Sequence, residues 1–216
     1  MKVFSKVALV LALLIALSAP AGLAEGITVT DMVGREVTLP AAARKVVALT
    51  ASDAEVLYAV GAGETLVGRG KFVDYPAEAL SAPAVQSGNE TNVEQIIALE
   101  PDAVIMAKMA QKQEQVEALE KAGIAVIVTD AQDIAGVYES MLLLGAVTGH
   151  DEEAAQAVKA MQEALAALSE KAKANPVEAS VYFELSPLEW GLWTMGQGTF
   201  MQDVADLLGL QNAFAD

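Results

Sequence analysis

The sequence predicts a layered α/β fold, with two Rossmann-like lobes that contain parallel sheets and are joined by a single long helix. Between residues 45 and 129, apolar strands alternate with amphipathic helices, as they do in a mostly parallel sheet covered by helices. Residues 133–174 then have a helical pattern, and residues 180–208 repeat the order strand, loop, helix. One strand and one helix cannot close a parallel sheet, so we expect the second lobe to be incomplete.

The first 24 residues have the layout of a secretory signal peptide. Lys2 and Lys6 form a basic start, residues 7–17 are apolar, and small residues precede a cleavage site after Ala24. The apolar run is too short to span a bilayer comfortably, which disfavours a membrane anchor. We therefore expect an exported protein that is cleaved after Ala24.

Charge and cysteine content restrict the partners and the compartment. Removal of Lys2 and Lys6 with the signal peptide changes the formal net charge from −16 to −18, a poor match for the phosphate backbone of nucleic acids. The chain has no cysteine, so it has neither disulfides nor a lipid-modifiable residue at the processing site. We expect a free periplasmic protein, with secretion as the alternative.

Strands are expected where short apolar runs lie between turn residues. Residues 27–30 and 35–39 alternate apolar and polar side chains, as in a β-hairpin, and Pro40 closes the hairpin. The runs that follow in the first lobe are continuously apolar, which is typical of strands covered on both faces. The further predicted strands are residues 45–50, 103–106, 124–129 and 180–185, and another begins at Leu66.

Two capping boxes predict where helices begin. In the first, Ser52 caps the helix and Glu55 reaches back to the cap, and in the second Thr91 and Glu94 have these roles. The structural role is favoured for Glu55, whereas for Glu94 a functional role stays open. The predicted helices are residues 52–60, 91–99, 113–122 and 198–208, most of them followed by a glycine that ends the helix.

The helical stretch from residue 133 to residue 174 is expected to be a rigid connector. It has apolar residues at three- and four-residue steps, a joint at residues 148–151, and an end at Asn175-Pro176. Its apolar stripes should pack against both lobes rather than against a partner helix, and part of the stripe over residues 158–168 should be exposed. His150, the single histidine, lies at the joint and is expected to be a helix-end residue rather than a metal ligand.

Several motifs, none of them decisive alone, occur in a characteristic order over residues 28–216. They are Thr30-Asp31-Met32-Val33-Gly34-Arg35 with Leu39-Pro40, residues 47–55, Gly61-Ala62-Gly63, Asp74-Tyr75-Pro76, residues 92–102, Gly196-Gln197-Gly198-Thr199-Phe200 and residues 209–212. In these motifs the chain resembles the helical-backbone periplasmic substrate-binding proteins of ABC importers for iron–siderophore complexes, haem and cobalamin.

The resemblance implies two α/β lobes that close only slightly on a ligand held between them. The implied division is a signal peptide at 1–24, a first lobe at 25–132, a connecting helix at 133–175 and the start of a second lobe at 176–216. It also implies that one glutamate from each lobe docks onto arginines of the membrane permease. Glu94 matches the first of these, and the second belongs to a stretch beyond Asn212 that this sequence lacks, which favours truncation.

The ligand is expected at the loops that follow the carboxyl ends of the strands, where open α/β sheets bind ligands. Aromatic rings there would contact a planar ligand, and cations would pair with an anionic chelate. For the tryptophans, packing within the second lobe is an equal alternative, and lysines such as Lys71 are often simply solvated. The candidate ligand-binding residues are Thr50, Ser52, Arg69, Phe72, Tyr75, Lys108, Trp190 and Trp193.

The resemblance implies a binding protein that captures a ferric chelate, haem or a corrinoid and delivers it to an ABC permease. No resident cofactor and no direct metal site are expected, and the protein is expected to be a monomer. The alternatives are a truncated remnant or partner-binding lobe that binds no ligand, and an exported α/β enzyme. The enzyme is disfavoured because the sequence has no nucleophile elbow, no cysteine, a single histidine and no phosphate-binding glycine loop.

Overall fold

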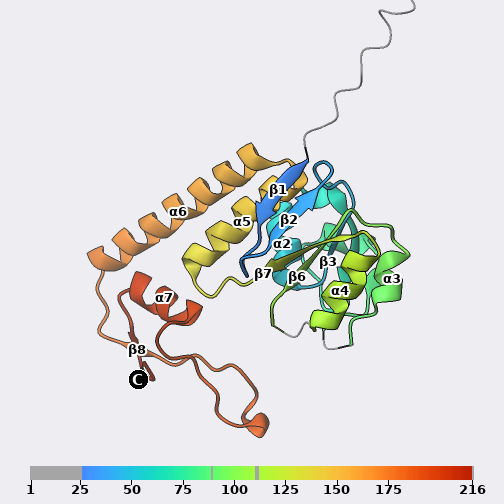
Figure 1. Cartoon of the computed structure of the whole chain (residues 1–216). Coiled ribbons are helices and arrows are strands. Elements are labelled where there is room, and N and C mark those ends of the chain that lie inside the picture. The colour runs from blue at the N-terminus through green and yellow to red at the C-terminus, as the bar shows by residue number, and fades with distance from the viewer. Residues whose placement is uncertain (1–25, 89, 110–111, 216) are drawn as a thin grey trace, which may run out of the picture.

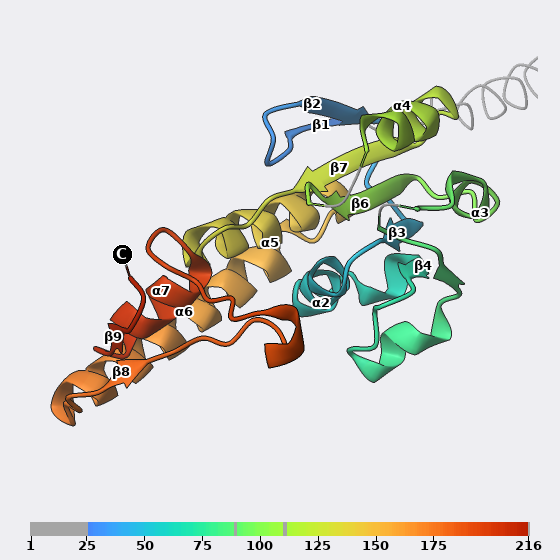
Figure 2. The same cartoon turned by 90° about the horizontal axis from the view of Figure 1, so that it is seen from below.

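A computed structural model describes residues 26–88, 90–109 and 112–215 of the chain (Figure 1). The predicted signal peptide at residues 1–24 lies outside the described residues. Within the described ranges, no helix combines the length and the apolarity that a membrane crossing requires. The chain forms a large α/β part and a smaller C-terminal part, and the long helix α6 (Asp151–Ala174) runs from one to the other (Figures 1 and 2).

The large part is built on a sheet of five parallel strands in the order β5-β4-β3-β6-β7. This confirms the predicted α/β class with a parallel sheet. The strand order reverses between β3 and β6, because the chain adds β4 and β5 on one side of β3 and then β6 and β7 on the other. The strands are β3 (Val46–Ala48), β4 (Leu66–Gly70), β5 (Ala84–Val85), β6 (Ala103–Ala107) and β7 (Ala125–Thr129).

Helices cover both faces of this sheet, because successive side chains of a strand point to opposite faces. Val46 and Ala48 belong to the core formed with α2 (Ala51–Ala59), α5 (Ile134–Thr148) and α6. Val47 and Leu49 belong to the opposite core, formed with α3 (Val93–Ile97) and α4 (Gln113–Lys121). Two single-turn helices, η1 (Gly63–Thr65) and η2 (Ala77–Ser81), complete the connections.

The predicted hairpin is confirmed as β1 (Ile27–Thr30) and β2 (Glu36–Leu39), and its turn is fixed to the edge strand β7. The Met32 N–H donates to the Val128 carbonyl at 3.1 Å, and the Val128 N–H donates to the buried Asp31 carboxylate at 3.2 Å. Arg35 binds the same carboxylate and the Val126 carbonyl. The hairpin thereby covers a sheet edge that would otherwise present unpaired backbone groups.

Both predicted capping boxes are wrong by one or two residues. Thr50, not Ser52, caps α2, and its hydroxyl accepts from the Asp53 N–H. Asn92, not Thr91, caps α3 and accepts from the Gln95 N–H at 3.0 Å. In each case several neighbouring residues have suitable side chains, and the strand or loop before the helix decides which of them has the extended backbone that a cap needs.

The connector is two helices rather than a single one, and the expectation that it packs only against the lobes is wrong. Gly149, with φ of 74°, ends α5, and the chain folds back so that α6 lies alongside α5 (Figures 1 and 2). A Cβ on Gly145 would lie 2.4 Å from that of Ala154, so glycine permits this close approach. His150 precedes α6 as the predicted helix-end residue.

The C-terminal part has fewer strand residues than predicted. A strand was predicted at residues 180–185, but β8 spans only Ser180–Val181. Its partner in the sheet, β9 (Gln211–Asn212), also has two residues, so the pairing ends there. Between them lie the single turn η3 (Leu188–Trp190) and α7 (Phe200–Leu207). The predicted exposure of the connector stripe is confirmed at its end, where Leu168 is 48% exposed although Val158 is buried.

Candidate functional site

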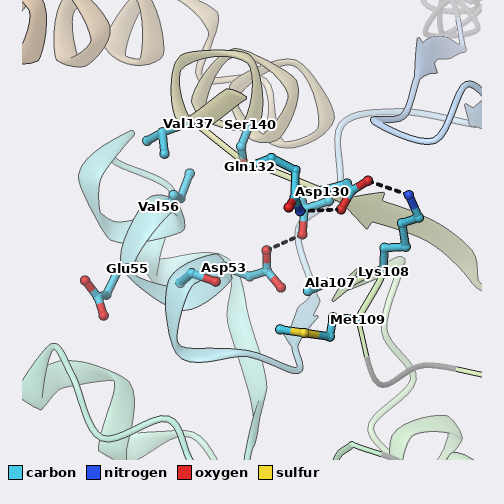
Figure 3. Close-up of a pocket in the computed structure, with 13 residues that line it drawn as sticks. Asp53, Glu55, Val56, Ala107, Lys108, Met109, Asp130, Gln132, Val137 and Ser140 are labelled. Atoms are coloured by element: carbon cyan, nitrogen blue, oxygen red, sulfur yellow. Dashed lines mark hydrogen bonds and ion pairs between the residues drawn. The ribbon is translucent and has the colours of Figure 1, made fainter. Parts of the chain in front are cut away.

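A cavity of about 370 Å³ opens at the carboxyl ends of β3, β6 and β7, between α2 and α5 (Figure 3). It lies where the strand order reverses, which is the position where open α/β sheets bind ligands. β6 and β7 contribute their last residues and those that directly follow them, and α2, which comes after β3, contributes residues of its first turns. The lining residues are Ser52, Asp53, Glu55, Val56, Ala107, Lys108, Met109, Thr129, Asp130, Ala131, Gln132, Val137 and Ser140.

Asp53 is the buried carboxyl group of this cavity, and it is held from two strands. The Thr50 hydroxyl, after β3, donates to the Asp53 carboxylate. The Thr129 hydroxyl, at the end of β7, donates to its other oxygen at 2.8 Å, and Figure 3 marks this hydrogen bond at Asp53. Burial raises the pKa of Asp53 above its ordinary value of 3.8, and the two hydroxyl hydrogen bonds oppose this rise. The group thus retains its proton more readily than a surface aspartate and can then donate a hydrogen bond.

Lys108 and Asp130 form an ion pair on the other side of the cavity. Their Nζ and Oδ2 atoms are 2.7 Å apart, and the Gln132 side chain donates to the second oxygen of Asp130 at 2.8 Å (Figure 3). The pair joins the residues that follow β6 and β7. As the Lys108 side chain is 62% exposed, the pair contributes little to stability, but it fixes the charge pattern of the site.

A second cavity, of about 450 Å³, adjoins the first and shares Glu55, Val56 and Val137 with it. Together the two cavities form one groove between α2, α5, α6 and the loop after β4, and we call it the α2 groove. Apolar and aromatic side chains dominate its second half: Tyr58, Ala59, Tyr75, Pro76, Met141 and Met161. Such walls suit an organic ligand with a large apolar surface.

Metal chemistry in the described part of the chain is limited by the available donors. No group of three or more His, Cys, Asp or Glu side chains within residues 26–88, 90–109 and 112–215 could hold a metal ion. The groove therefore offers hydroxyls, carboxylates and apolar walls for an organic molecule.

Four of the predicted ligand-binding residues belong to this groove or support it. Ser52 and Lys108 line the first cavity, and Tyr75 lines the second. Thr50 caps α2 and holds the Asp53 carboxylate. The segments that follow β3, β4 and β6 thus meet at the carboxyl ends of the strands, where the sequence predicted the ligand.

The other four lie outside the lining of the two cavities. The Arg69 guanidinium donates to the Ala82 and Val73 carbonyls, at 3.1 and 2.8 Å, and so braces the loop after β4. Phe72 is 73% exposed, with the Lys71 ammonium 4.8 Å from its ring centroid. Trp190 and Trp193 are exposed in the C-terminal part, where the Trp193 indole donates to the Trp190 carbonyl at 3.0 Å.

The residues of the groove that were not predicted from the sequence include Asp53, Val56, Val137 and Met161. Asp53 had a usable signal, because it lies three residues after Thr50 at the end of a buried strand. The other three occupy helical positions whose apolar character also fits core packing. Only the relative placement of α2, α5 and α6 distinguishes a groove wall from a core residue.

A family model described as periplasmic binding protein matches residues 46–216. An ABC transporter substrate-binding lipoprotein of Bacillus subtilis (strain 168) is 35% identical over 195 residues, which are 88% of this chain and 62% of that protein. A vitamin B12-binding protein of Yersinia pestis (strain Pestoides F) is 32% identical over 181 residues, or 83% and 63% of the two chains.

Solved structures show the same fold. The periplasmic vitamin B12-binding protein of Vibrio cholerae superimposes with a TM-score of 0.68 at 25% identity, covering 81% of this chain and 67% of that one. A periplasmic haem-binding protein from Pseudomonas aeruginosa gives a TM-score of 0.70 at 22% identity, covering 81% and 64%. The chain thus spans slightly less than two thirds of the length of the curated relatives that it matches.

Proposed function

The chain belongs to the periplasmic binding protein family, and from this premise we propose that it is the extracytoplasmic solute-binding component of an ABC importer. It captures a metal chelate, either an iron complex or a corrinoid, and delivers it to the membrane permease. The observation that carries this proposal is the α2 groove at the point where the strand order reverses. Relatives described as binding vitamin B12 and haem support the ligand class.

In this proposal the α/β part supplies one wall of the ligand site and the C-terminal part faces it. The first lobe comprises residues 25–132, and residues 133–175 connect it to the start of the second lobe at 176–216. The exposed rings of Trp190, Trp193 and Phe72 are available to contact a bound ligand. The protein binds and releases its ligand without a chemical step.

Glu94 is the proposed contact with the permease. It lies in the first turn of α3, which follows β5 and leads to β6. Because these strands are parallel, α3 begins at the carboxyl ends of the strands, where the groove also opens. Its side chain is exposed and makes no ion pair with any residue in the described ranges. An unpaired glutamate on this side can bind an arginine of a partner without first breaking an internal contact.

A ligand titration tests the proposal. Ferric siderophores, haem and cobalamin are added separately to the purified protein, and the quenching of tryptophan fluorescence is followed, with calorimetry as a second readout. Saturable binding of at least one chelate at about micromolar affinity or tighter supports the proposal. The absence of saturable binding by all three classes contradicts it and favours a chain that no longer binds ligand.

A Glu94→Arg variant tests the docking role separately. It should bind the same chelate as the wild type but fail to stimulate ATP hydrolysis by the cognate permease complex. A Glu117→Arg variant on α4 is the control, because Glu117 is also an exposed helical glutamate. Equal stimulation by the Glu94 variant and the wild type would exclude this residue as the docking contact.

A further inference from the structure

The cations near the α2 groove are all engaged with other groups of the chain. Two of the three guanidinium nitrogens of Arg69, Nε and one terminal nitrogen, donate to the backbone carbonyls of Ala82 and Val73, and the residue lines neither cavity. Lys108 lines the first cavity, but Asp130 neutralises it at 2.7 Å. Lys71 lies over the ring of Phe72 and also lines neither cavity.

The acids of the groove exceed its cations. Asp53, Glu55 and Asp130 all line the first cavity, and among the described residues that line the two cavities Lys108 is the single cation. Glu55 is shared by both cavities, and its side chain has no hydrogen bond or ion pair with any described residue. Figure 3 shows it on the α2 side of the site, away from Lys108. Its negative charge is therefore not compensated within the groove.

The C-terminal part does not supply the missing cation. The sequence after Lys173 contains no lysine, arginine or histidine. Its acidic residues are Glu178, Glu184, Glu189, Asp203, Asp206 and Asp216. A ligand between the two parts of this chain would therefore meet negative charge from both.

We propose that the α2 groove takes an uncharged or cationic metal chelate and excludes anionic ones. This inference rests on the proposed function and restricts its ligand class. An anionic chelate would approach the free carboxylate of Glu55, and the single cation of the lining, Lys108, is already neutralised by Asp130. A neutral chelate with amide or hydroxyl groups meets Ser52, Gln132 and Ser140 at the first cavity and apolar walls at the second.

Two sets of chelates whose members share a scaffold and differ mainly in charge test this. The first is ferrioxamine B, which is cationic, with its neutral N-acetyl and anionic N-succinyl derivatives. The second is cyanocobalamin, which is neutral, with its anionic monocarboxylic acid. In whichever set binds to the protein, the anionic chelate should bind at least about tenfold more weakly than the neutral one at low salt. This difference in affinity should shrink as added salt screens the charges.

A pair of variants links the discrimination to the groove. Glu55→Gln should narrow the difference between the neutral and anionic chelates, whereas Glu117→Gln on α4, outside both cavities, should leave it unchanged. Equal or tighter binding of the anionic member by the wild type overturns the charge inference and leaves the proposed function standing. Binding of no member of either set, together with no binding of haem or other siderophores, overturns both.

Discussion

The Asp203 carboxylate, in α7, accepts a hydrogen bond from the Ile134 N–H, the first residue of α5, at 3.0 Å. The N–H groups in the first turn of a helix have no intrahelical acceptor, and the helix dipole favours a negative charge there. Because α5 packs on the parallel sheet, this hydrogen bond connects the C-terminal part directly to the α/β part. It fixes the two parts relative to each other by a route other than α6.

Replacement of Asp203 by alanine should loosen the C-terminal part. Loss of a charged acceptor at a helix N-terminus costs about 1 kcal/mol, equivalent to a fall in melting temperature of roughly 2–4 °C for a chain of this size. Limited proteolysis should cut more rapidly after α6. Asp206→Ala is the control, since among the described residues its carboxylate hydrogen-bonds only to Gln202, also in α7, and it should leave both measurements nearly unchanged.

Replacement of Arg35 by methionine should destabilise the α/β part. The Arg35 guanidinium binds the Asp31 carboxylate, Glu120 and the Val126 carbonyl, and the Asp31 side chain is fully buried. Removing the arginine leaves that carboxylate without its cation, which costs about 2 kcal/mol because the Arg35 side chain is 32% exposed, less than the roughly 3–5 kcal/mol of a fully buried pair.

Urea denaturation of the Arg35 variant measures this effect. Arg44→Met is the matched control, because only the backbone N–H of Arg44 is bonded, to Asp102, and its free energy of unfolding should change by less than about 0.5 kcal/mol. A similar loss in both variants would show that the Asp31–Arg35 pair has no special role.

Apart from the two-residue edge strand β5, which was not predicted, the strands of the α/β part could be predicted from the sequence, and the path of the chain after them could not. Continuous apolar runs such as residues 103–106 and 124–129 have one physical explanation in a chain with alternating helices, namely burial on both faces. Gly149 was recognised as a joint between α5 and α6, but whether the chain continues or folds back there depends on its φ of 74° and on the contact of Gly145 with Ala154. The periodicity of the apolar residues carries no information about the φ of Gly149 or about this contact.

For the candidate site, the sequence predicted which loops contribute residues, but not how their side chains are engaged. Ser52, Tyr75 and Lys108 follow strands that the sequence identified, so their convergence follows from the parallel sheet. The engagement of Arg69 with its own loop, and the absence of a partner for Glu55 among the described residues, depend on backbone positions that no local pattern encodes. The charge of the groove therefore became apparent only in three dimensions.

Replacement of Asp53 by asparagine should change how stability depends on pH. Burial raises the pKa of Asp53 in the folded chain above the ordinary value of 3.8. As the pH rises above 3.8 the unfolded chain loses this proton first, so the free energy of unfolding falls until the pH passes the raised value. Below 3.8 both states hold the proton and the group has no effect.

The variant lacks this contribution, so its stability relative to the wild type should increase as the pH rises above 3.8, until the pH passes the raised pKa of Asp53. Denaturation of both proteins by urea at several pH values in this range measures the trend. A constant difference between the two proteins would mean that Asp53 ionises alike in the folded and unfolded chain.

Replacement of Val56 by phenylalanine should block the α2 groove without unfolding the protein. Val56 is half-buried and shared by both cavities, so a larger ring at this position extends into the space proposed for the ligand. The affinity for the chelate that binds in the titration should fall at least tenfold, or about 1.4 kcal/mol, while the free energy of unfolding changes by less than about 1 kcal/mol. Val116→Phe is the matched control, because Val116 is a half-buried valine of α4 on the opposite face of the sheet, beside a different cavity. Unchanged binding by the Val56 variant would place the ligand elsewhere, and an equal loss in both variants would indicate a general distortion of the sheet.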